Sequence, residues 1–182
     1  MSKVTPRKVA DQIRRTLKDG GSAEHAEGVQ WFFKDEIKSH GWYTADLRRA
    51  AVRSRKAIRK EFGLEFLIKV ADLLFSGSVL EEKVAAVFLL EKLDTEFGDR
   101  EFRLFESWLD RISSWADHDA LVHSLISPMV AGQACASPSG LSLGKIAESM
   151  APPRSLRSAY PSSAPAAAFR ADRLAFQSVA GC

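Results

Sequence analysis

The chain has 182 residues, of which 46% are hydrophobic and 27% are charged, the balance expected of one soluble globular domain with a real core. Its formal net charge of +3 is too small to indicate nucleic-acid binding by itself, so any DNA surface must come from segregation of charge. The sequence shows no signal region and no run of about 18 apolar residues, which argues against membrane association and favours the cytoplasm.

Two helices are predicted at the start of the chain. An apolar stripe at helical spacing predicts the first, Thr5–Asp19, and a Gly-Gly pair ends it. The stripe consists of Val9, Ile13 and Leu17. Ser22 is a suitable N-cap for the second helix, Ala23–Ser39, which includes the three consecutive aromatics at 31–33. We expect at least two of these aromatics to lie in the core.

A strongly basic helix follows, Ala45–Phe62, with Thr44 as its expected N-cap and Gly63 as its stop. A short apolar helix, Leu64–Phe75, comes next. The helix predicted over 80–97 has apolar residues on more than one face, which indicates deep burial. Its polar side is assigned to Glu81, Glu82, Glu91 and Lys92.

The last predicted helices are Glu101–Ile112 and Trp115–Val130, joined by a turn at Ser113 and Ser114. About seven helices with short loops and no alternating strand pattern predict an all-α fold built from antiparallel pairs. Pairs repeating at roughly 40 residues fit a HEAT-like solenoid, although no internal repeat is visible. A plain helical bundle is the alternative. The helical domain is expected to span residues 1–131.

Composition changes abruptly in residues 132–182. This segment holds nine Ser and five Pro, and its charged side chains account for the whole net charge. It lacks apolar periodicity, so we expect disorder. The two cysteines, Cys135 and Cys182, both fall here, and no Cys or His spacing in the chain suggests a metal site.

Trp115 and Asp119 are the most informative pair in the sequence. Their four-residue spacing places an indole and a carboxylate on one face of a helix. Such a pair suits a flat, cationic ligand. For an isolated pair of this kind, packing of the tryptophan between helices and solvation of the aspartate would be the simpler interpretation.

The residues around this pair favour a ligand-binding role over simple packing. Three segments resemble the DNA alkylation repair family in their order and spacing. They are Glu81–Ala86 before a leucine-rich run, Phe105–Asp110, and Ser114 with Trp115 and Asp119. The members of this family are alkylpurine DNA glycosylases built from HEAT-like repeats. The resemblance implies that Trp115 faces the damaged nucleotide and that Asp119 is the catalytic carboxylate. It also implies duplex DNA with alkylated bases as the partner, and no metal or cofactor.

The basic helix is a candidate for phosphate contact. Several of its cations fall on overlapping faces, although a solvated face explains most charge runs. The candidates are Arg48, Arg49, Arg53, Arg55, Lys56, Arg59 and Lys60. The resemblance adds Lys34 as a backbone contact and Phe32 as an aromatic near the lesion. No membrane or obligate protein partner is expected.

The family's next repeat carries an arginine and a second tryptophan, and nothing after residue 131 matches them in the written frame. In a shifted reading frame, Met150-Ala151 necessarily encodes tryptophan, so we hypothesise a frameshifted gene. A DNA-binding cleft that lacks this arginine and second tryptophan predicts weak or absent glycosylase activity and poor solubility. The alternatives are a non-catalytic helical-repeat scaffold that binds nucleic acid or protein, and a non-functional remnant.

Overall fold

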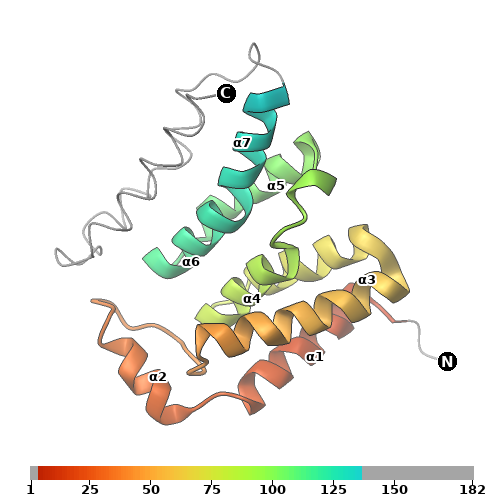
Figure 1. The fold of residues 1–182 in the computed structure, drawn as a ribbon. Coiled ribbons are helices and arrows are strands. Elements are labelled where there is room, and N and C mark those ends of the chain that lie inside the picture. The colour runs from red at the N-terminus through yellow and green to blue at the C-terminus, as the bar shows by residue number, and fades with distance from the viewer. Residues whose placement is uncertain (1–3, 137–182) are drawn as a thin grey trace.

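The computed structural model describes residues 4–136, and these form the predicted all-α fold (Figure 1). The helices are α1 (Pro6–Asp19), α2 (Ala23–Gln30), α3 (Thr44–Phe75), α4 (Leu80–Leu90), α5 (Asp99–Trp108), α6 (Trp115–Leu121) and α7 (Ser127–Ala136). Two 3-10 turns, Asp94–Glu96 and Leu109–Arg111, flank α5, and a π-helical segment, Val122–Ile126, joins α6 to α7. Within this part of the chain no helix is long and apolar enough to cross a membrane.

Helix α1 agrees with the prediction. The hydroxyl of Thr5 accepts a hydrogen bond from the amide of Lys8 at 3.3 Å, and Pro6 supplies a fixed φ at the first helical position. Leu17 is buried, and Val9 and Ile13 pack against the core. The apolar stripe read from the sequence is therefore the face that α1 buries.

Helix α2 is shorter than predicted, because it ends at Gln30 rather than Ser39. The Gln30 side chain donates to the carbonyl of Asp35 at 2.9 Å and accepts from the amide of Ile37 at 3.0 Å. These bonds give the backbone an alternative to the helix. The expectation of two core aromatics is also wrong, since Trp31 is 91% exposed and Phe32 is 69% exposed.

Helix α3 contains both helices predicted between 45 and 75. Gly63 has φ 81° and kinks the helix at the predicted break, a conformation that costs glycine little. The predicted capping residue is wrong by one position, because Tyr43 occupies the N-cap and Thr44 is the first helical residue. Helix α3 packs against both α1 and α4.

Helix α4 lies between two groups of helices, with α1 and α3 on one side and α5 to α7 on the other (Figure 1). It ends at Leu90 rather than Phe97, and Lys92 then adopts a positive φ of 65°. The predicted deep burial is confirmed. The assignment of Glu81 and Glu82 to a polar side is wrong, because both are buried, as is Lys83.

Each of these three charged residues binds a different neighbour of α4. The Glu81 carboxylate accepts hydrogen bonds from the backbone amides of residues 40–42 at 2.8 to 3.3 Å. Glu82 pairs with Arg14 of α1 at 3.0 Å, and Lys83 pairs with Asp117 of α6. These three buried charges therefore join the elements around the core.

Candidate functional site

The start of α6 is fixed by a capping box. The Ser114 hydroxyl accepts from the amide of Asp117 at 3.4 Å, and the Asp117 carboxylate accepts from the amides of Ser114 at 2.7 Å and Ser113 at 2.9 Å. Two orphan backbone donors of the helix end are satisfied in this way. Trp115, the first residue of the helix, is thereby held at a defined point.

A buried ion pair reinforces that point. The Nζ of Lys83 lies 3.2 Å from Oδ2 of Asp117, with side chains only 3% and 0% exposed. Lys83 also donates to the carbonyl of Arg111 and lies 5.5 Å from the ring centre of Phe75. Sequence reasoning missed this pair, because Lys83 follows Glu81 and Glu82 in the first turn of α4 and its partner lies in a different helix.

Trp115 is half-buried and stacks on Phe33, with ring centres 5.2 Å apart and an angle of 17° between the planes. The loop after α2 therefore reaches α6 (Figure 1). The family resemblance implied Phe32 as the aromatic near the lesion, but the structure brings Phe33 to Trp115 and leaves Phe32 on the surface. The indole Nε1 is buried and has no hydrogen-bond partner among residues 4–136.

Asp119 follows one turn later and keeps access to solvent, with a side chain 30% exposed. Its Oδ1 lies 3.1 Å from Nδ1 of His118. His118 is buried. The arrangement places an aromatic ring, a partly exposed carboxylate and a buried imidazole on one face of a helix.

The candidate phosphate-contacting residues divide into two groups. Arg48 pairs with Glu91 at 3.1 Å and lies over the Phe88 ring, and Arg55 donates to the Glu91 carbonyl. Arg59 makes a bidentate pair with Glu96 at 2.9 and 2.8 Å. These contacts tie α3 to the segment after α4.

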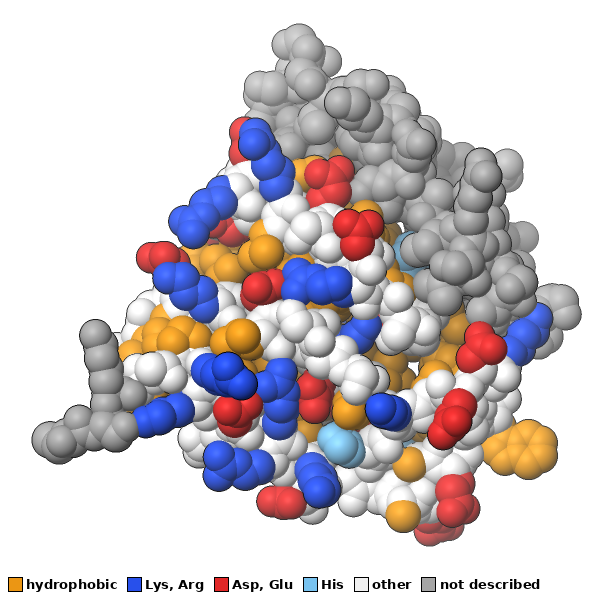
Figure 2. Space-filling view, turned by 180° about the vertical axis from the view of Figure 1, so that it is seen from behind, with side chains coloured by type: hydrophobic (Ala, Val, Ile, Leu, Met, Phe, Trp, Pro, Cys, Tyr) orange, Lys and Arg blue, Asp and Glu red, His pale blue; other side chains and the backbone are white. Residues whose placement is uncertain are grey.

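The second group faces solvent. Arg53, Lys56 and Lys60 are exposed and have no ion pair within residues 4–136, whereas Arg49 pairs with Asp46. Lys34 is exposed as well. Basic and acidic side chains alternate over the face seen in Figure 2, so the described surface there carries no broad, purely positive patch.

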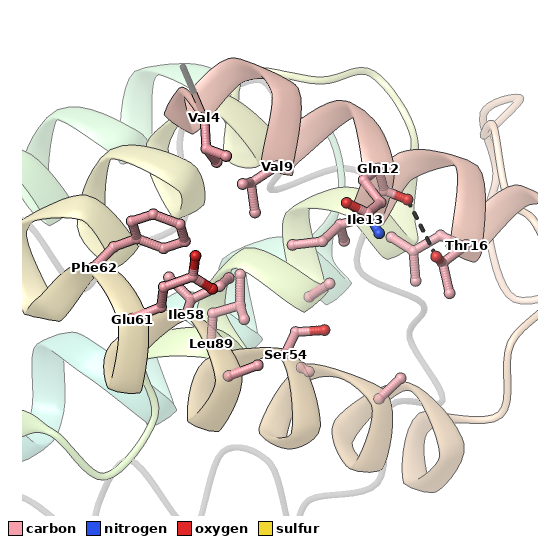
Figure 3. A pocket seen from close by; sticks show the side chains of 15 residues that line it. Val4, Val9, Gln12, Ile13, Thr16, Ser54, Ile58, Glu61, Phe62 and Leu89 are labelled. Atoms are coloured by element: carbon pink, nitrogen blue, oxygen red, sulfur yellow. Dashed lines mark hydrogen bonds between the residues drawn. The ribbon is translucent and has the colours of Figure 1, made fainter. Parts of the chain in front are cut away.

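A cavity of about 410 Å³ lies elsewhere, between α1 and α3 (Figure 3). Val9 and Ile13 of α1 face Ile58 and Phe62 of α3 across it, and Leu89 of α4 lines it too. Neither Trp115 nor Asp119 lines it. This cavity is therefore separate from the candidate site.

A family model described as DNA alkylation repair enzyme matches residues 13–139, which include Trp115, Asp119 and the basic half of α3. The chain belongs to the DNA alkylation repair enzyme family. No curated protein and no solved structure matches it significantly. Family membership indicates a role in DNA repair, with DNA as the substrate or partner.

The Ser-rich and Pro-rich segment, and with it the frameshift hypothesis, lies almost wholly outside the described residues.

Proposed function

We propose that this chain is a DNA glycosylase of impaired activity that hydrolyses the N-glycosidic bond of N3- or N7-alkylated purines in duplex DNA. The observation that carries the proposal is the pairing of Trp115 with a partly exposed Asp119 on one face of α6, inside the segment that matches the family. A helical end fixed by a capping box and a buried ion pair is a rigid support for such a pair.

The chemistry needs little beyond this pair. Alkylation at N3 or N7 gives the purine a positive charge, so the bond between C1′ and the purine breaks with its electron pair moving to the base, which leaves neutral. Positive charge then develops on the deoxyribose. The Asp119 carboxylate stabilises that charge and accepts a proton from the water whose oxygen bonds to C1′. The Trp115 indole contacts the cationic base through a face of its ring.

We assign DNA binding to contacts between basic side chains and the phosphates. The exposed cations of α3, Arg53, Lys56 and Lys60, are best placed for them, because no ion pair within residues 4–136 engages them. Lys34 and Phe32 lie on the loop that reaches α6 and are assigned to the DNA backbone and the lesion. Such contacts hold a duplex without reading its sequence.

The alternative is a non-catalytic scaffold with stacked, HEAT-like helix pairs that binds nucleic acid or protein. The pairing of Arg48 and Arg59 with acidic side chains favours it, since these cations are engaged within the fold. Incubating the full chain with duplexes that contain either N7-methylguanine or guanine distinguishes the two functions. Release of the methylated base alone supports the glycosylase. Binding without release supports the scaffold.

A further inference from the structure

His118 and Asp119 are adjacent in α6, and their side chains meet. Nδ1 of the imidazole lies 3.1 Å from Oδ1 of the carboxylate, within hydrogen-bond distance. The imidazole is buried, whereas the carboxylate is partly exposed. The contact therefore connects a group held by packing to one that can meet a ligand.

The surroundings of His118 restrict its movement. Asp117, the residue before it, is fully buried, forms the capping box and pairs with Lys83. The terminal torsion of an aspartate side chain has only broad minima, so its hydrogen-bond partners decide where the carboxylate points. A buried N–H that donates to one carboxylate oxygen narrows this range and directs the other oxygen.

We infer that His118 is a positioning residue that donates from Nδ1 to Asp119 and directs its carboxylate toward the deoxyribose of the damaged nucleotide. This role rests on the proposed function, in which Asp119 is the reacting carboxylate. It requires the tautomer with the proton on Nδ1, because the other tautomer would place a lone pair against the negative oxygen. Orientation fixed in advance accelerates bond cleavage and leaves DNA affinity unchanged.

The tautomer is measurable without any activity. Long-range proton–nitrogen NMR of the full chain at about pH 8, where a free imidazole is neutral, reports which ring nitrogen of each histidine carries the proton. The chain has four histidines, and loss of one signal set in His118→Asn assigns it. A proton on Nδ1 supports the proposal. A proton on Nε2 overturns it.

Single-turnover excision tests the consequence. His118→Leu fills the space without a donor, whereas His118→Asn places an amide N–H near the position of Nδ1. We expect about a 10- to 100-fold slower release of N7-methylguanine for the leucine variant, unchanged DNA affinity, and recovery of most of the rate for the asparagine variant. His25→Asn, on α2, is the matched control. Equal rates in His118→Leu and the unchanged chain, or equal losses in both variants, overturn the positioning role.

Excision by the Asp119→Asn variant, measured in the same assay, separates the positioning role of His118 from the proposed glycosylase function. A full rate for Asp119→Asn refutes the proposed function. Loss of rate in Asp119→Asn together with a full rate in His118→Leu refutes only the role of His118.

Discussion

Lys83 and Asp117 form a buried ion pair, with Nζ 3.2 Å from Oδ2, that connects the central helix α4 to the first turn of α6. Through Asp117 the pair reaches the capping box that precedes Trp115. The position of the candidate site therefore depends on two charges that are withdrawn from water.

Removal of one charge of this pair is expected to be costly. Lys83→Met leaves the Asp117 carboxylate buried and uncompensated, so we expect a loss of about 3–5 kcal/mol in the free energy of unfolding. Urea denaturation followed by circular dichroism measures it. Lys69→Met, which breaks an exposed pair with Glu65, is the control and should cost less than about 1 kcal/mol. Similar losses in the two variants would refute the importance of burial.

Glu81 is expected to hold the loop between α2 and α3. Its carboxylate accepts from three backbone amides and from the Ser39 hydroxyl at 2.6 Å. Glu81→Gln loses charge-assisted bonds and turns an amide N–H toward other donors, so we expect a loss of about 1–3 kcal/mol in unfolding free energy. Amide hydrogen exchange should quicken at residues 40–42. Unchanged exchange there would contradict this account, and Glu106→Gln, on the surface of α5, is the control.

The two neighbouring phenylalanines of the loop should behave differently. Phe33→Ala removes the ring that stacks on Trp115, and we expect a loss of about 1 kcal/mol or more together with a change in the near-ultraviolet circular dichroism of the tryptophans. Phe32→Ala alters a side chain that is 69% exposed and should change stability by less than about 0.5 kcal/mol. The reverse order of effects would show that the loop packs differently.

The exposed cations of α3 should control DNA affinity. We expect Arg53→Ala, Lys56→Ala and Lys60→Ala each to weaken binding to any duplex and to reduce the slope of log affinity against log salt by up to about 0.9. Fluorescence anisotropy over a range of salt concentrations measures both quantities. Arg59→Ala, which breaks the pair with Glu96, should instead lower stability. A salt slope that none of the three variants changes would place the DNA on another surface.

Sequence patterns predicted the elements that depend on local chemistry. The stripe of α1 and the break at Gly63 follow from side-chain spacing and from a left-handed conformation that suits glycine, and both are confirmed. Helix ends that depend on distant or unusual bonds were predicted poorly. The end of α2 depends on the Gln30 side chain, and α4 stops before Lys92 takes a positive φ.

For the candidate site, the sequence indicated Trp115 and Asp119 but not what surrounds them. The ion pair between Lys83 and Asp117 joins residues 34 positions apart, and hydrophobic periodicity carries no information on such partners. The stack of Phe33 on Trp115 is similarly non-local. Spacing along a helix predicts which residues share a face, whereas contacts between elements require the fold.

The most direct test of the central claim is single-turnover release of N7-methylguanine from a duplex by the unchanged chain and by Asp119→Asn, with DNA affinity measured in parallel. Asp110→Asn, an exposed neighbour on the preceding turn, is the matched control. We predict slow but measurable release by the unchanged chain and by the control, and about a 100- to 1000-fold loss in Asp119→Asn with binding retained. Equal release by all three proteins, or no release by any of them, would contradict the assignment of Asp119 as the reacting carboxylate.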